Sequence, residues 1–161
     1  MRGLIPAIAL ALLAACSQGP GGNSALAQSP AVHAVSGLPV VSLTVTHAAT
    51  PHRFRVEVAK TGEQQERGLM FRTSMGADEG MIFPMEPPRN ASFWMRNTVI
   101  PLDIIFVGPD GRITNIAANA VPYDETPLPS TGLVKAVLEL NGGRAAALGI
   151  GPGDLVTWSS T

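Results

Sequence analysis

Hydrophobic and polar residues alternate along most of the chain after residue 39, which is the pattern of half-buried β-strands. In the first such run Val41, Leu43 and Val45 alternate with polar side chains, and a second run begins at Arg53. The two runs are close enough in sequence to predict a hairpin. The pattern predicts strands at residues 41–46, 53–58, 81–83, 91–95, 102–107, 112–118, 133–140 and 155–158.

Two short segments carry helical signals instead. Thr61 and Gln64 have the spacing of a capping box, in which a hydroxyl accepts a hydrogen bond from the third helical amide. Further along, Asn141 can cap a second helix, and Gly149 can end it in the left-handed conformation. The predicted helices span residues 63–72 and 143–148.

These elements predict an α+β fold that is mainly β and forms a single compact domain. Most successive strands have no helix between them, which argues against a parallel doubly wound sheet. We therefore expect an antiparallel barrel-like or sandwich sheet with the two short helices at its ends. The chain of 161 residues is long enough for one domain with one core.

Charge and cysteine content narrow the functional classes. Charged residues make up 14% of the chain and the net charge is −1, so no basic surface points to a nucleic-acid partner. The chain has one cysteine, Cys16, which excludes an internal disulfide and a cysteine-based zinc site.

The N-terminus has the pattern of an export signal. An apolar run at residues 4–15 follows a positive start, and it is too short to span a membrane. The letters LAAC at 13–16 resemble the cleavage box of bacterial lipoproteins, in which the cysteine carries lipid. The alternative is ordinary cleavage after Ala27, which leaves no lipid. We expect a signal peptide at 1–15, lipidation of Cys16, a flexible tether at 16–38 and a domain at 39–161.

A polar turn after an aromatic pair holds the densest candidate chemistry. Arg96, Asn97 and Thr98 supply a planar cation, an amide and a hydroxyl, which together can hold a carboxylate, a phosphate or a sugar hydroxyl. Trp94 beside them could stack on a sugar or a peptide. The alternative is that the asparagine and threonine only stabilise a tight turn.

Two carboxylates lie in otherwise apolar strands. Asp103 is followed by four apolar residues, and a carboxylate buried there needs a partner. Arg67, Arg72 or Arg96 could supply a structural ion pair. Glu139 alternates with apolar residues and could equally lie on a solvated strand face. Together, Asp103 and Glu139 could form a two-carboxylate catalytic site if their strands bring them together.

Methionines are concentrated in one part of the chain. Thioethers favour soft ions such as Cu(I), so copper binding is one interpretation, and filling of core gaps is the other. No histidine pattern accompanies them, and we expect neither a metal nor a cofactor. Five of the six are Met70, Met75, Met81, Met85 and Met95.

Five motifs are ERGLMFR at 66–72, GMIF at 80–83, FWMRNT at 93–98, IPLDI at 100–104 and LELNGG at 138–143. In this order they resemble the bacterial and archaeal family called domain of unknown function 192. The family's turn more usually has lysine where this chain has Arg96, which keeps the charge. The resemblance implies a compact α+β domain dominated by β-structure and frequent export. It implies no activity, cofactor or catalytic residue.

The leading hypothesis is a small exported lipoprotein that acts as a binding module on the periplasmic side of a bacterial membrane. It rests on the expected anchor and on the lack of a recognisable catalytic set. Expected partners are the membrane, through the lipid on Cys16, and a small-molecule, peptide or sugar ligand. The alternatives are an envelope hydrolase or lyase that uses Asp103 and Glu139, and a methionine-based copper protein. The predicted ligand site comprises Arg67, Trp94, Arg96, Asn97, Thr98, Asp103 and Glu139.

Overall fold

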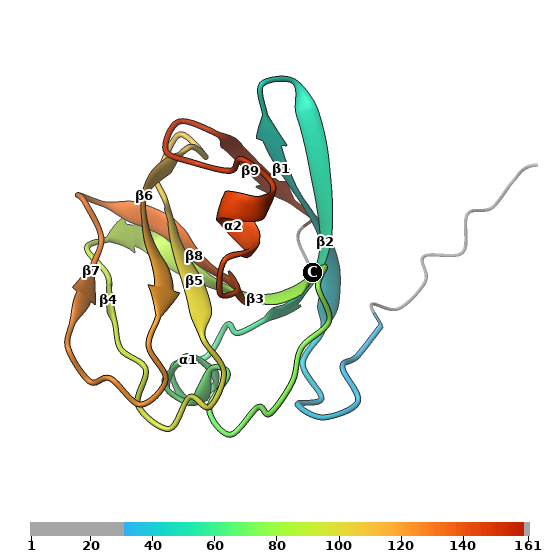
Figure 1. The fold of residues 1–161 in the computed structure, drawn as a ribbon, viewed down its shortest axis with the longest axis vertical. Coiled ribbons are helices and arrows are strands. Elements are labelled where there is room, and N and C mark those ends of the chain that lie inside the picture. The colour runs from blue at the N-terminus through green and yellow to red at the C-terminus, as the bar shows by residue number, and fades with distance from the viewer. Residues whose placement is uncertain (1–30, 160–161) are drawn as a thin grey trace, which may run out of the picture.

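A computed structural model describes residues 31–159, which form nine strands and two short helices (Figure 1). In chain order these are β1 (Val40–His47), β2 (Thr50–Val58), α1 (Gly62–Arg67), β3 (Glu79–Arg89), β4 (Ser92–Phe93), β5 (Leu102–Val107), β6 (Ile113–Ala120), β7 (Leu128–Pro129), β8 (Val134–Asn141), α2 (Arg144–Ala147) and β9 (Leu155–Trp158). The predicted signal peptide, Cys16 and residues 17–30 lie outside the described residues. Within 31–159 no helix has the length and apolar character needed to cross a membrane.

Seven strands form one sheet in the order β6-β5-β8-β3-β2-β1-β9, and β4 pairs with β7 in a separate small sheet. The pair β2–β3, which α1 connects, is parallel, and the other pairs are antiparallel. The edge strands meet only at one corner, through a bridge between Arg112 and Leu155. The α+β, mainly β class is therefore confirmed, whereas the sheet is mixed and open rather than an antiparallel barrel or sandwich.

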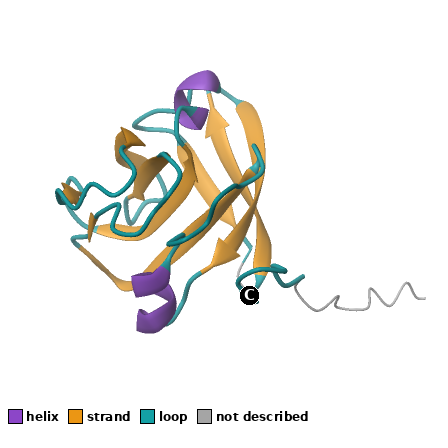
Figure 2. Ribbon diagram, turned by 60° about the horizontal axis from the view of Figure 1, so that its bottom comes forward, coloured by secondary structure: helices purple, strands orange, loops and turns teal. Residues whose placement is uncertain are grey.

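Both faces of this sheet are covered. One hydrophobic cluster, on what we call the α2 face, contains Ile105 and Leu138 together with Ala145 of α2. The other, on what we call the Met95 face, contains Ile104 and Met95. All six residues of β5 are buried, as expected for a strand with a core on each side. Figure 2 shows the two helices at opposite ends of the molecule.

Helix α1 begins as predicted and ends early. The Thr61 hydroxyl accepts from the amide of Gln64 at 3.2 Å, and the Gln64 side chain accepts from the amide of Thr61 at 3.0 Å, which completes the capping box. The helix stops at Arg67 because Gly68 has φ +45°, which no helical residue adopts. The predicted helix over 63–72 is thus too long, and residues 68–78 instead form a loop.

Two strand predictions are wrong for reasons of pairing. β3 continues through the prolines at 84–88 instead of ending there, because the pairing with β8 shifts register between Pro84 and Arg89. Such a shift accommodates residues that lack a donor N–H. The strand predicted at 91–95 shortens to Ser92–Phe93, and it pairs with β7 in the small sheet.

The residues just before β1 are held against the domain, although they belong to the predicted tether. His33 donates its backbone N–H to the carbonyl of Leu38 at 2.8 Å, which closes a turn. The hydroxyl of Ser36 bonds to the buried carboxylate of Glu57. Arg72 binds the same carboxylate through two N–H groups, at 2.8 and 3.1 Å. The folded part of the chain therefore includes residues 31–38.

We predict that Ser36→Ala loosens this segment without unfolding the domain. The variant loses the hydroxyl's bond to Glu57 and the bond that it accepts from the Leu38 amide at 3.2 Å. Both lie at the exposed edge of the domain and Arg72 still satisfies Glu57, so global stability should fall by no more than about 1 kcal/mol. Hydrogen–deuterium exchange should accelerate at the amides of Gly37 and Val40, which bond within the segment. Unchanged exchange at these two amides would show that the Ser36 contact does not hold the segment.

Candidate functional site

Asp103 has a structural partner, but it is not an arginine. The side chain is fully buried, and one oxygen accepts from the backbone amides of Asn119 at 2.9 Å and Gly143 at 3.0 Å. The other accepts from the amide of Ala145 at 2.8 Å, in the first turn of α2. The arginine ion pair considered for Asp103 does not form in the described residues. Three backbone donors satisfy this carboxylate instead, and they tie the end of β6 and the start of α2 to β5.

Asp103 and Glu139 lie on opposite faces of the sheet. In the β5–β8 ladder Glu139 is opposite Ile104, and Asp103 is opposite Leu140. Side chains paired across a ladder point to the same face, and successive side chains alternate. Glu139 therefore belongs to the Met95 face and Asp103 to the α2 face. A two-carboxylate site is impossible in this arrangement, which overturns the hydrolase or lyase that would use this pair.

Glu139 is a nearly buried carboxyl group without an internal partner. It is 5% exposed, between Met81 on β3 and Ile104 on β5 in the strand register. Burial raises the pKa of Glu139 to about 8. Within residues 31–159 its oxygens accept no hydrogen bond, but they remain slightly accessible to solvent. The group is therefore largely neutral at pH 7 and keeps a residual contact with water.

The polar turn after Trp94 is fixed by backbone hydrogen bonds to two other segments. The carbonyl of Asn97 accepts from the amide of Phe71 at 2.8 Å, in the loop after α1. The carbonyls of Met95 and Thr98 accept from the amide of Tyr123 at 3.1 and 3.2 Å, in the loop after β6. Three loops thus meet at one place on the Met95 face, and the turn holds them together.

Side chains inside the turn explain part of its polar composition. The Thr98 hydroxyl is buried and donates to the carbonyl of Arg96 at 3.3 Å. The Asn97 amide donates a long contact to the Met70 sulfur at 3.9 Å. The Thr98 bond lies within the turn, as in the turn-stabilising alternative that the sequence left open, and the Asn97 contact joins the turn to the loop after α1.

The outer side of this junction carries exposed aromatic rings and arginines. Phe71, Trp94 and Tyr123 are 59%, 47% and 62% exposed. The Arg67 guanidinium lies over the Phe71 ring at 5.8 Å, and that of Arg96 over the Trp94 ring at 5.5 Å. In the described part of the chain neither arginine has an ion-pair or hydrogen-bond partner. We call these five residues the aromatic–arginine surface.

Backbone strain is concentrated at the same junction. Phe71 has φ +62°, Asn97 has φ +53° and Tyr123 has φ +63°. Asparagine tolerates this left-handed conformation, but for a bulky aromatic residue it is rare and costs roughly 1–2 kcal/mol. Strain that the fold maintains often marks functional sites. At this junction the positive φ angles direct the side chains of Phe71 and Tyr123 outward, away from the hydrogen-bonded turn.

The structure therefore separates the predicted site residues into three groups. Arg67, Trp94 and Arg96 come together on the exposed surface, with Asn97 and Thr98 forming the turn behind them. Glu139 lies on the same sheet face, in the buried layer. Asp103 lies on the opposite face and has no free oxygen.

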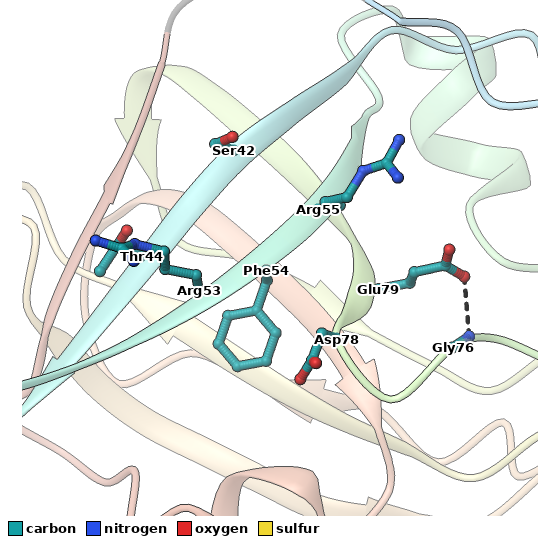
Figure 3. Close-up of a pocket in the computed structure, with 8 residues that line it drawn as sticks. All are labelled: Ser42, Thr44, Arg53, Phe54, Arg55, Gly76, Asp78 and Glu79. Atoms are coloured by element: carbon teal, nitrogen blue, oxygen red, sulfur yellow. Dashed lines mark hydrogen bonds between the residues drawn. The ribbon is translucent and has the colours of Figure 1, made fainter.

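A depression elsewhere on the molecule contains none of these residues. It has a volume of about 640 Å³ and lies outside β1 and β2, where Arg53 and Arg55 alternate with the buried Phe54 (Figure 3). The two guanidinium groups point apart in Figure 3, and the Glu79 carboxylate bonds to the Gly76 amide. This open surface of mixed charge does not converge on one ligand. Its lining residues are Ser42, Thr44, Arg53, Phe54, Arg55, Gly76, Asp78 and Glu79.

The methionines lie mainly in the core of the Met95 face. Met81, Met85 and Met95 are buried there, and Met75 packs against them. Residues 31–159 contain no group of three or more His, Cys, Asp or Glu side chains that could hold a metal ion. These positions are those of core-filling residues.

Sequence reasoning missed Phe71 and Tyr123 as members of the exposed surface. Phe71 follows Arg67 by four residues within one of the motifs quoted above. Tyr123 is the only tyrosine of the chain and lies in the proline-containing loop between β6 and β7. An aromatic residue in such a loop is a weak signal that could have been used. The positive φ angles that turn both residues outward have no sequence signature.

Fold and site together define a small α+β, mainly β domain with an arginine- and aromatic-rich surface on one side. The chain belongs to the DUF192 family, described as uncharacterized ACR, which matches residues 43–158. It is similar to a protein of unknown function from Novosphingobium aromaticivorans, with 65% identity and a TM-score of 0.79 over 82% of this chain and 94% of that one. It is also similar to a protein from Sinorhizobium meliloti called a "putative transcription regulator", with 38% identity and a TM-score of 0.73 over 75% and 95% of the two chains. None of the curated proteins matches the sequence.

Proposed function

We propose that this protein is an exported, lipid-anchored binding module of the cell envelope, and that its aromatic–arginine surface binds a ligand with an anionic group. The export signal and the lipid on Cys16 are inferred from the sequence pattern. The ligand is a small molecule, a peptide or a sugar that bears a phosphate or a carboxylate.

One observation carries the proposal: Arg67 and Arg96 each lie over an exposed aromatic ring, and neither forms an ion pair with the part of the chain that the structure describes. Among residues 31–159, Arg72 and Arg144 form ion pairs, so arginine pairing is available elsewhere in the fold. Stacking fixes the plane of a guanidinium and leaves its N–H groups free for a bidentate contact with phosphate or carboxylate. Aromatic residues and arginine are also the types that dominate binding hot spots.

Binding of phenyl phosphate tests this proposal, because the probe combines an anion with a ring that can stack. Isothermal titration should show saturable binding that Arg67→Ala and Arg96→Ala each weaken at least about tenfold, the effect of losing a charge-assisted hydrogen bond. Arg53→Ala is the matched control, since Arg53 is exposed but lies outside the surface, and it should not change the affinity. Equal effects of all three variants, or no binding, would contradict the proposal.

Phe71→Gly separates binding from stability. Glycine relieves the strain at φ +62° by roughly 1–2 kcal/mol but makes the unfolded chain more flexible, so the net stability should stay within about 1 kcal/mol. Phenyl phosphate affinity should fall because Arg67 loses its stacking partner. A thermal melt and the same titration measure the two effects. Retained affinity would remove Phe71 from the proposed surface.

A further inference from the structure

We propose that the partner of the aromatic–arginine surface is the headgroup layer of the bilayer that holds the lipid anchor. This inference rests on the proposed function, because it identifies the anionic groups as lipid phosphates. The surface would then orient the domain on the membrane rather than capture a free solute.

The connection to the predicted anchor reaches the domain beside this surface. Ser36 bonds to Glu57, and Glu57 is held by Arg72, which directly follows Phe71. In Figure 1 the segment before β1 and the loops after α1 and β4 lie toward the same, lower end of the molecule. Residues 17–30 alone separate Cys16 from the described chain, and 14 residues span at most about 50 Å. A lipid on Cys16 therefore keeps the segment before β1 within about 50 Å of the bilayer, which is near enough for this end of the domain to reach it.

The residue types suit an interface between water and lipid. Tryptophan and tyrosine have an apolar ring and a polar group, and they are enriched at the headgroup level. Arginine can place its aliphatic stem against apolar groups while its guanidinium binds phosphate. Trp94, Tyr123 and Arg96 supply this combination at one exposed junction.

Nearby acidic residues limit how the contact can work. Glu66 precedes Arg67, and Asp124 and Glu125 follow Tyr123, all of them exposed. Their charges oppose a general attraction to an anionic membrane. The contact must therefore come from phosphates that reach the two arginines individually, together with ring insertion. Replacing Trp94 or either arginine should therefore weaken membrane binding more than a rise in ionic strength does.

Tryptophan quenching tests this inference in the full lipidated chain, which has two tryptophans. The protein is reconstituted into vesicles of phosphatidylethanolamine and phosphatidylglycerol, with a fraction of the lipids brominated in the acyl chain. Trp158→Phe leaves Trp94 as the only tryptophan, and its emission, excited at a wavelength that tyrosine does not absorb, should be quenched and shifted to shorter wavelength. Trp94→Phe leaves Trp158, which packs against the cluster on the α2 face and should not be quenched. Adding Arg67→Ala and Arg96→Ala to the Trp158→Phe variant should reduce the quenching.

Each other outcome overturns a defined part of the account. An unquenched Trp94 in vesicle-bound protein would refute membrane contact, and retained phenyl phosphate binding would then leave the proposed function standing with a soluble ligand or a protein as partner. Equal quenching of both tryptophans would show that the domain has no preferred orientation. Protein that does not sediment with the vesicles would refute the lipid anchor itself.

Discussion

Asp103→Ala should unfold the protein at a temperature about 10–15 °C lower than the wild type. The substitution removes the acceptor for three backbone N–H groups, of which that of Ala145 is in a buried residue. A buried donor left without a partner costs about 1–3 kcal/mol, so the total loss should be about 3–5 kcal/mol. Thermal and urea unfolding measure this loss directly.

Asp103→Asn is the more discriminating variant. Asparagine keeps the shape, but its NH₂ group must face one of the three N–H donors, so this variant should also lose about 2 kcal/mol or more. Asp78→Asn is the matched control, because Asp78 forms an exposed ion pair with Arg144 and should cost less than about 1 kcal/mol. Phenyl phosphate binding at a temperature where the variant is folded should be unchanged. Full stability with lost binding would instead place Asp103 in the ligand site.

Glu139→Gln should stabilise the protein, and the gain should grow with pH. In an unfolded chain the carboxyl group has a pKa near 4.5, whereas burial raises the pKa to about 8 in the folded protein. Between these values the folded state keeps a proton that the unfolded state has released, so stability from this group falls as the pH rises. The loss is complete above pH 8 and is on the order of 5 kcal/mol, at about 1.36 kcal/mol per pH unit over the difference between the two pKa values.

The pH dependence of the difference between wild type and Glu139→Gln isolates this group from every other carboxylate. Urea unfolding of both proteins from pH 4 to pH 9 should give a difference near zero or slightly unfavourable to the variant at pH 4. The difference should increase in favour of the variant up to about pH 8 and then level off. A difference that is constant across this range would mean that Glu139 ionises as it does in water.

The sequence predicts those features of the structure that depend on residues close together in the chain. The capping box at Thr61 and Gln64 starts α1, the apolar run after Asp103 forms a strand buried on both faces, and the Thr98 hydroxyl bonds within the turn at 96–98. Of the predicted site residues, Arg67, Trp94 and Arg96 are exposed near one junction, whereas Asp103 and Glu139 are buried in the sheet. Each of these features follows from side-chain type and short spacing, which one sequence contains.

The errors arise where the outcome depends on pairing between distant segments. The faces of Asp103 and Glu139 depend on the register between β5 and β8, and alternation within each strand alone does not fix it. The partners of Asp103 are backbone amides, which any residue supplies and no motif reveals. β3 passes through its prolines because β8 pairs with it and shifts register there.

A chemical-shift map of the ¹⁵N-labelled protein titrated with phenyl phosphate tests the central claim most directly. If the aromatic–arginine surface is the binding site, the largest shifts should fall on the amides of residues 67–71, 94–98 and 121–124. The amides that bond to Asp103 should shift little, because they lie on the other face of the sheet. Shifts centred on the depression beside Arg53 and Arg55, or on the loop before α2, would contradict the account.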